Sequence, residues 1–138
     1  RPRRRRVCAV FSAPAMKRSL HILADFSGCA GEPVYLTHKF RVRRKTLAMI
    51  RRAGFSIVAS RFHKFAPGRY GEGGITGVVI VSESHLSVHT WPERALVNLD
   101  VFFCNYTRDN TRKARAVFQE FKRLYRPARV REREVWRD

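Results

Sequence analysis

Residues 96–104 have the sequence LVNLDVFFC, which carries a clear strand pattern. Side chains of a β-strand point alternately to its two faces, so apolar residues at every second position predict one buried face. The apolar face here consists of Val97, Leu99, Val101 and Phe103. The opposite face consists of Asn98, Asp100, Phe102 and Cys104. We therefore predict a half-buried strand whose apolar face packs against a second layer.

Further strands and two helices flank this stretch. Residues 19–26 and 55–65 read as strands, the β-branched run at 75–81 predicts a strand buried on both faces, and the tail at 129–136 predicts a charged edge strand. Apolar residues at helical spacing predict one helix from Leu36 to a left-handed C-cap at Gly54, and another from an N-cap at Asn110 to Pro127. These elements predict an α+β fold: a two-layer sandwich of a mostly antiparallel sheet, of four or five strands, with two helices on one face.

The charge of the chain is strongly positive, at +18 over 138 residues. Such a charge favours nucleic-acid binding, because lysine and arginine displace condensed counterions. Residues 1–15, however, contain RPRRRR and no acid, and we interpret them as a flexible basic extension before a single domain at 16–138. The sequence contains none of the usual nucleic-acid-binding motifs. We therefore expect nucleic-acid contact to be incidental, and expect deletion of residues 1–15 to leave folding and activity intact.

Cysteine content and hydropathy narrow the class further. No apolar run approaches the roughly 18 residues that a membrane-spanning helix needs. Cys8, Cys29 and Cys104 are an odd number of cysteines, and their separations match no zinc-binding spacing. Reduced thiols, a cytoplasmic location and no metal site are the expectations that follow.

Residues 82–104, SESHLSVHTWPERALVNLDVFFC, resemble the prokaryotic S-adenosylmethionine decarboxylases, which are pyruvoyl-dependent. The match comprises the stretch from Glu83 to His89, the following residues 90–93 (TWPE), and Asp100 with Cys104. Supporting matches lie at 25–29 (DFSGC), 62–65 (FHKF) and 77–79 (GVV). The resemblance extends over roughly residues 19–135, with several separated motifs in the family's order.

The resemblance implies a proenzyme that cuts itself between Glu83 and Ser84. In that chemistry the Ser84 hydroxyl attacks the Glu83 carbonyl and converts the peptide bond to an ester. Removal of the Ser84 α-proton then releases the chain that ends in Glu83, and the serine becomes a pyruvoyl group. His89 matches the family's processing base. Thr76 stands where the family usually carries a serine that assists the acyl shift, and it keeps the hydroxyl.

The resemblance also implies how the mature enzyme acts. The substrate amine forms a Schiff base with the pyruvoyl group, which replaces pyridoxal phosphate as the electron sink. Cys104 matches the proton donor to the resulting carbanion. Glu93 would bind the ribose hydroxyls and Phe65 would stack on adenine, although the loop at 66–75 is longer than usual in the family. The product, decarboxylated S-adenosylmethionine, supplies aminopropyl groups for spermidine synthesis.

Strand geometry adds a condition to this chemistry. Ser84 and His89 are five residues apart, so in a regular strand they point to opposite faces. Either the site lies on a bend or the histidine acts from a second subunit, and the family is expected to form a homodimer. We expect His63 and His85 to have structural or hydrogen-bonding roles.

Two other functions remain open at this stage. The same self-processed fold can house an ornithine or arginine decarboxylase, because the prosthetic group does not choose the side chain of the substrate. An unprocessed homologue could instead be a basic nucleic-acid-binding module. That reading predicts an uncut chain with salt-dependent binding to DNA or RNA.

Overall fold

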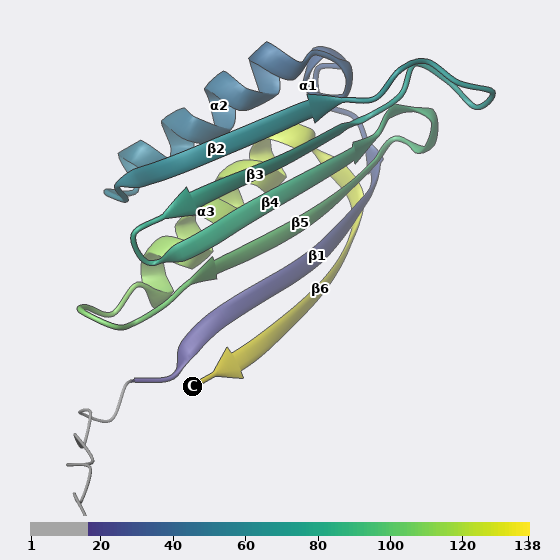
Figure 1. Cartoon of the computed structure of the whole chain (residues 1–138). Coiled ribbons are helices and arrows are strands. Elements are labelled where there is room, and N and C mark those ends of the chain that lie inside the picture. The colour runs from purple at the N-terminus through teal and green to yellow at the C-terminus, as the bar shows by residue number, and fades with distance from the viewer. Residues whose placement is uncertain (1–16) are drawn as a thin grey trace, which may run out of the picture.

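A computed structural model describes residues 17–138; the basic extension predicted at 1–15 lies outside the described residues. Six strands form one antiparallel sheet in the order β2-β3-β4-β5-β1-β6 (Figure 1). The strands are β1 (Ser19–Cys29), β2 (Ile57–Lys64), β3 (Ile75–Val81), β4 (Ser84–Trp91), β5 (Leu96–Phe103) and β6 (Pro127–Arg137). The helices are α1 (Val34–Thr37), α2 (Lys39–Arg52), α3 (Thr111–Tyr125) and the short 3-10 turn η1 (Pro92–Arg94).

The two long helices, α2 and α3, lie side by side on one face of the sheet, as Figure 1 shows. The α+β two-layer sandwich is therefore confirmed, with six strands where four or five were predicted. The alternation of β5 is also confirmed, because Val97, Leu99, Val101 and Phe103 are all buried beneath the helices. Burial of each such side chain contributes about 1.5–3 kcal/mol, which makes this layer the main source of stability.

Local sequence explains where the first long helix ends. Gly54 has a φ of 86°, a left-handed conformation that glycine adopts without steric cost. The Gly54 N–H donates to the carbonyl of Arg51, and the Phe55 N–H donates to that of Ile50, which is the Schellman pattern. The predicted C-cap at Gly54 is thus confirmed. The helix begins later than predicted, because the extended backbone of His38 separates α1 from α2.

Asn110 occupies the N-cap position of α3 but does not cap the helix with its side chain. The side-chain amide instead donates to the carbonyl of Cys104, at 2.8 Å. Asp109 accepts the Thr111 N–H at 3.0 Å, and this hydrogen bond lowers the pKa of the Asp109 carboxyl. The predicted N-cap position at Asn110 is therefore confirmed, but its side chain bonds the loop after β5 and does not cap the helix.

The second face of the sheet is not covered by any element of the described chain (Figure 1). We predicted that residues 75–81 are buried on both faces, and this is wrong for the single chain. Ile75, Val79 and Val81 are buried, but Val78 and Ile80 on the open face are 38% and 48% exposed. The reason is that both long helices lie on the same side of the sheet.

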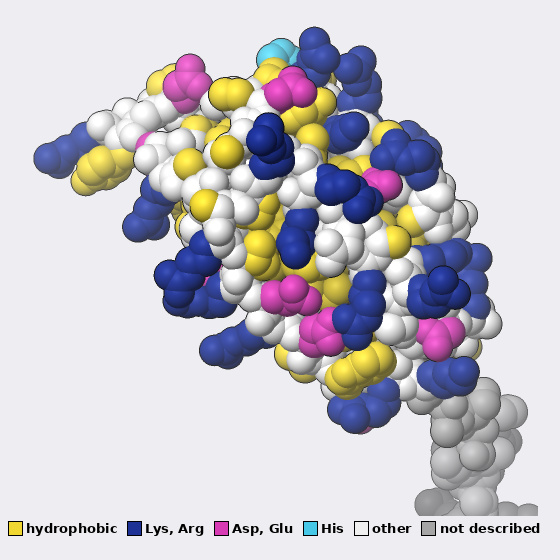
Figure 2. Space-filling view, turned by 180° about the vertical axis from the view of Figure 1, so that it is seen from behind, with side chains coloured by type: hydrophobic (Ala, Val, Ile, Leu, Met, Phe, Trp, Pro, Cys, Tyr) yellow, Lys and Arg dark blue, Asp and Glu magenta, His cyan; other side chains and the backbone are white. Residues whose placement is uncertain are grey.

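Basic side chains are abundant on the helical layer. Figure 2, a view of the molecule from behind, shows many Lys and Arg side chains spread over this face, with Asp and Glu side chains between them in several places. The helix α2 alone carries seven Lys and Arg residues in KFRVRRKTLAMIRR. Much of the positive charge thus lies on the face opposite the residues that the sequence assigns to chemistry. Among residues 17–138, no helix has the length and apolar character needed to span a membrane.

Candidate active site

The predicted cleavage bond lies at the tight turn between β3 and β4. Ser84 is the first residue of β4 and pairs with Val81 across the turn and with Phe103 on β5. The φ of Ser84 is 122°, which is rare for a residue with a side chain. Such a conformation costs about 1–3 kcal/mol and persists only where the surroundings impose it. Strain is therefore concentrated at the serine that follows the predicted cut.

The carbonyl of Glu83 receives a strong backbone hydrogen bond. The Cys104 N–H donates to this oxygen at 2.7 Å, just after β5 ends. A donor in this position polarises the carbonyl and stabilises negative charge that develops on its oxygen during attack. The backbone of Cys104 thus faces the bond that the sequence predicts to be cut, which the sequence alone did not indicate.

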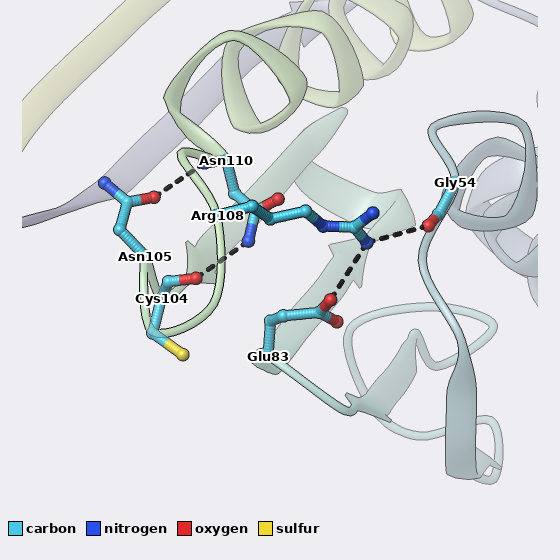
Figure 3. Close-up of polar contacts among 6 residues, drawn as sticks. All are labelled: Gly54, Glu83, Cys104, Asn105, Arg108 and Asn110. Atoms are coloured by element: carbon cyan, nitrogen blue, oxygen red, sulfur yellow. Dashed lines mark hydrogen bonds and ion pairs between the residues drawn. The ribbon is translucent and has the colours of Figure 1, made fainter.

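The side chain of Glu83 is also held in place, as Figure 3 shows. Its Oε1 accepts a hydrogen bond from Arg108 at 2.9 Å, and Arg108 also donates to the carbonyl of Gly54 at 3.1 Å. On the same loop, Asn110 holds Cys104 through the side-chain bond described above, and its N–H donates to Asn105 Oδ1 at 2.7 Å (Figure 3). The loop after β5 therefore clamps both Glu83 and Cys104.

Thr76 and His89 form a second group, at the other end of β4. The two residues are directly opposite each other on β3 and β4, and Thr76 Oγ1 lies 2.9 Å from His89 Nδ1. Pairing of β4 with both neighbours runs without a register shift from Ser84 to His89, so there is no bend between them. Five residues of strand separate Ser84 from His89 by about 16 Å. One chain does not bring this threonine and histidine to the Ser84 hydroxyl.

A chain of polar side chains on the open face was not predicted. His21 Nε2 lies 2.6 Å from Asp100 Oδ1, and His85 Nε2 lies 3.5 Å from the same oxygen. His85 Nδ1 lies 3.2 Å from Ser84 Oγ. The three residues come from β1, β5 and β4, and only the sheet register places them together. The signal present in the sequence was their shared polar parity, since each stands between residues of the buried face.

A cavity of about 420 Å³ lies beside the predicted ribose-binding residue Glu93. It is lined by Tyr70, Trp91, Glu93 and Arg94. Tyr70 belongs to the loop between β2 and β3, which the sequence marked as unusually long. Phe65, the predicted adenine-stacking residue, is 49% exposed and contacts the ring of His63, but it is not among the lining residues of this cavity. The structure thus adds two aromatic residues to the candidate pocket.

The two cysteines within the described residues differ in their surroundings. Burial raises the pKa of the Cys29 thiol to about 11, and its sulfur donates weakly to the carbonyl of Phe26. Cys104 is half-buried just after β5, next to the candidate cleavage bond. We had placed Cys104 on the face of Asn98 and Asp100, but the strand ends one residue earlier, at Phe103.

Comparison with known proteins identifies the family and the fold. The sequence model of the family described as S-adenosylmethionine decarboxylase matches residues 20–138. Two relatives, each named S-adenosylmethionine decarboxylase proenzyme, come from Pyrococcus horikoshii and Carboxydothermus hydrogenoformans. The first is 35% identical over 76% of this chain and 70% of its own length, and the second is 36% identical over 83% and 85%. The crystal structure of the adenosylmethionine decarboxylase from Aquifex aeolicus superposes with a TM-score of 0.74 at 28% identity, covering 89% of this chain and 92% of that one.

Proposed function

Because this chain belongs to the S-adenosylmethionine decarboxylase family, we propose that it is a proenzyme that cuts itself between Glu83 and Ser84 and then decarboxylates S-adenosylmethionine. The observation that carries the proposal is the 2.7 Å hydrogen bond from the Cys104 N–H to the Glu83 carbonyl. This bond presents an activated carbonyl to the hydroxyl of the next residue. The rare φ of Ser84 also strains the backbone next to this peptide bond, and cleavage of the bond would relieve that strain.

Self-cleavage begins with the attack of Ser84 Oγ on the Glu83 carbonyl carbon, through a five-membered ring. The Cys104 N–H stabilises the oxygen that becomes negative, and Arg108 keeps the Glu83 side chain from swinging into the path. Collapse of the ring yields an ester, and removal of the Ser84 α-proton releases the chain at Glu83. The dehydroalanine left at position 84 tautomerises to an imine, and water hydrolyses it to a pyruvoyl group with release of ammonia, so that the second chain, residues 84–138, begins with pyruvoyl.

A second protomer supplies the residues that one chain holds too far away. Thr76 and His89 lie near one end of β4 and Ser84 lies at the other, on a sheet whose open face exposes Val78 and Ile80. Packing two open faces against each other would bury these apolar side chains and bring the Thr76–His89 pair of one protomer to Ser84 of its partner. In this homodimer His89 removes the α-proton of Ser84, and Thr76 assists the acyl shift.

In the mature enzyme the pyruvoyl group would act as the electron sink, which accepts the electron pair of the carbon–carbon bond that breaks when carbon dioxide leaves. The residues around Ser84 fit that group, because Cys104 lies beside it and donates a proton from Sγ at the end of the reaction. Glu93 lies beyond His89 at the same end of β4, so in this homodimer the Glu93 of one protomer serves the Ser84 site of the other, where it accepts hydrogen bonds from the ribose hydroxyls in a cavity that Tyr70 and Trp91 line with aromatic surface. Phe65 stacks on adenine, and aromatic faces also attract the sulfonium of the substrate.

The family assignment favours S-adenosylmethionine over ornithine or arginine as the substrate. The relatives are named for S-adenosylmethionine, and the candidate pocket offers aromatic residues beside a carboxylate that suits a nucleoside. The product feeds spermidine synthesis, and we place the enzyme in the cytoplasm. Nucleic-acid binding is a minor reading, since the basic residues of the helical layer face away from the candidate site.

The test is the intact mass of the purified protein beside a Ser84→Ala variant. Wild-type protein should give two fragments that break after Glu83, the second blocked by pyruvoyl, while Ser84→Ala stays whole. The cut enzyme should then release carbon dioxide from S-adenosylmethionine and not from ornithine or arginine. An uncut wild-type chain would contradict the proposal and bring the binding-module reading forward.

The shared site has its own test, which mixes two inactive chains. Ser84→Ala and His89→Ala should each remain uncut when produced alone. When the two are produced together, the mixed dimer contains one site with an intact Ser84 and an intact His89. A fraction of the His89→Ala chains should therefore be cut at Glu83, and no cutting in the mixture would contradict a site shared between protomers.

A further inference from the structure

The open face holds titratable groups that the processing scheme above does not use. We propose that His85 is the base that activates the Ser84 hydroxyl for the first step of self-cleavage, with Asp100 and His21 as its positioning residues. This inference rests on the proposed self-cleavage at Glu83–Ser84. It assigns a different step from that of His89, which acts after the ester has formed.

The contact between His85 and Ser84 is direct. Ser84 Oγ lies 3.2 Å from His85 Nδ1, within hydrogen-bond distance, and both residues begin β4. A serine hydroxyl that donates to an unprotonated imidazole nitrogen can transfer its proton there as the oxygen becomes a nucleophile. The group that the serine attacks, the carbonyl of Glu83, is polarised by the hydrogen bond from the Cys104 N–H. Nucleophile, base and oxyanion donor thus meet at one turn.

Asp100 defines which nitrogen of His85 carries the proton. Its Oδ1 lies 3.5 Å from His85 Nε2, so the tautomer with a proton on Nε2 faces the carboxylate and leaves Nδ1 free to accept. When His85 takes the proton of Ser84, the imidazolium gains an ion-pair partner at that distance. The order of carboxylate, histidine and serine hydroxyl is that of serine hydrolase triads, with an ion-pair distance between Asp100 and His85 where a triad has a hydrogen bond.

His21 holds the carboxylate. Its Nε2 donates to Asp100 Oδ1 at 2.6 Å, and the side chain of His21 is only 12% exposed. The ring of Phe102 packs against both histidines, with centroids 5.1 Å from His21 and 6.0 Å from His85. Arg137 lies over the other side of this cluster, 4.7 Å from the Phe102 centroid. These contacts restrict the rotation of both imidazoles, as a base aimed at one hydroxyl requires.

The proton balance of the step closes without any other reactant. The Ser84 hydroxyl proton moves to His85 Nδ1 as the bond forms between Oγ and the Glu83 carbonyl carbon. The bond between that carbon and the Ser84 nitrogen then breaks, and the proton passes from His85 to the departing nitrogen. The products are an ester and a free amine, and His85 returns to its starting state.

The same three side chains have the types and spacing of a metal site, since their ligand atoms lie within 4.8 Å of one another. The hydrogen bonds of these side chains account for their positions without a metal ion. Asp100 Oδ1 is engaged with His21 at 2.6 Å, and the remaining nitrogen of His85 faces a serine hydroxyl that belongs to the reaction. The cluster therefore has the connections of a proton relay that ends on the nucleophile.

The experiment follows the rate and the stage of self-cleavage in full-length His85→Ala and His85→Asn chains. Loss of a general base should slow cutting by about 10²- to 10⁴-fold, and added imidazole should restore part of the rate in His85→Ala. The stage is read with hydroxylamine, which cleaves esters and leaves peptide bonds intact. The uncut His85 variants should resist hydroxylamine because they stop before the ester, whereas uncut His89→Ala should be cleaved by it.

Asp100→Asn should show a smaller slowing with the same resistance to hydroxylamine. His38→Ala serves as the matched control, because this exposed histidine lies between α1 and α2, and it should cut at the wild-type rate. Thermal unfolding of each variant verifies that it is folded. The inference is overturned if His85→Ala cuts as fast as wild type, or if its uncut chain is sensitive to hydroxylamine. An uncut wild-type chain would instead overturn the proposed function itself.

Discussion

The two faces of the sheet are built from the same strands but serve different ends. On the helix-covered face, β4 and β5 contribute Leu86, Val88, Val97 and Leu99, all at 3% exposure or less. On the open face the intervening positions of the same strands carry His85, His89 and Asp100 among others. Because successive side chains of a strand point to opposite faces, the residues that stabilise the fold alternate with the candidate site residues. Either set can therefore be substituted without altering the other.

The open face also differs from the covered one because no element of the described chain packs against it. It exposes Val78 and Ile80, and it holds the Thr76–His89 pair far from Ser84 within the chain. The covered face is packed by helices of the same chain, whereas we propose that a second protomer packs against the open face. The comparison therefore predicts that substitutions on the two faces damage different properties.

The largest effect should come from a charge placed on an apolar side chain of the open face. Ile80→Glu should prevent two sheets from packing, because it would place a charged carboxylate between two apolar faces, where it loses its water, and cutting at Glu83 should then fail. Light scattering should report a monomer where wild type is a dimer. Phe40→Glu is the control, since Phe40 is 68% exposed on the helical layer, and it should leave assembly and cutting unchanged. A dimeric, fully cut Ile80→Glu protein would break the proposed difference between the faces.

Cys104 separates processing from decarboxylation. Cys104→Ala keeps the backbone N–H that bonds the Glu83 carbonyl, so self-cleavage should continue. Decarboxylation should fall by about 10²- to 10⁴-fold, because the thiol that returns a proton is gone. Carbon dioxide release from S-adenosylmethionine, measured on protein of known cut fraction, gives the result. Cys29→Ala should keep the wild-type rate, and equal activity of the two variants would remove Cys104 from its assigned role.

On the covered face the expected damage is to stability. In an uncut Ser84→Ala background, Leu86→Ala should lower the free energy of unfolding by about 2–5 kcal/mol, because it leaves a cavity under α2 and α3. Ser87→Ala, one position along on the open face, should change it by no more than about 0.5 kcal/mol. Denaturant unfolding followed by circular dichroism measures both values. Similar losses at the two positions would mean that the open face also carries folding energy within one chain.

The smallest effect concerns Cys29, which the structure sets apart from Cys104. Its pKa, raised to about 11 by burial, keeps it in the unreactive thiol form near neutral pH. Alkylation of Cys29 by iodoacetamide should therefore be slow at pH 8 and rise about tenfold per pH unit until the pH approaches that value. Peptide mass spectrometry of the folded protein resolves this site. Rapid labelling of Cys29 at pH 8 would contradict the buried environment.

Much of the fold followed from local pattern. Alternation in β5, the left-handed Gly54 and the charged tail that forms β6 were all predicted, because each depends on residues adjacent in the chain. Burial of residues 75–81 on both faces was wrong for the single chain. A continuous apolar run shows that both faces avoid water, but it does not show whether the cover comes from the same chain.

The sequence predicted only some of the residues of the candidate site. Glu83, Ser84, Thr76, His89 and Cys104 were named from the resemblance to the family, whereas Arg108, Tyr70 and the His21–Asp100–His85 chain were not. Arg108 reaches Glu83 across 25 positions of sequence, and His21 reaches Asp100 across 79. Contacts of that kind depend on strand register and loop path, which no local pattern encodes.

The amino-acid sequence by itself determined the layers of this protein, its periodicities and the bond that its family motif marks for cleavage, because each of these is written in neighbouring residues. Only the tertiary structure decided that the Cys104 N–H faces the Glu83 carbonyl, that His85 and not His89 lies beside the Ser84 hydroxyl, and that one face of the sheet stays open. The physical reason is that hydrogen bonds and proton transfers act over a few ångströms, and the fold alone sets which distant residues come that close.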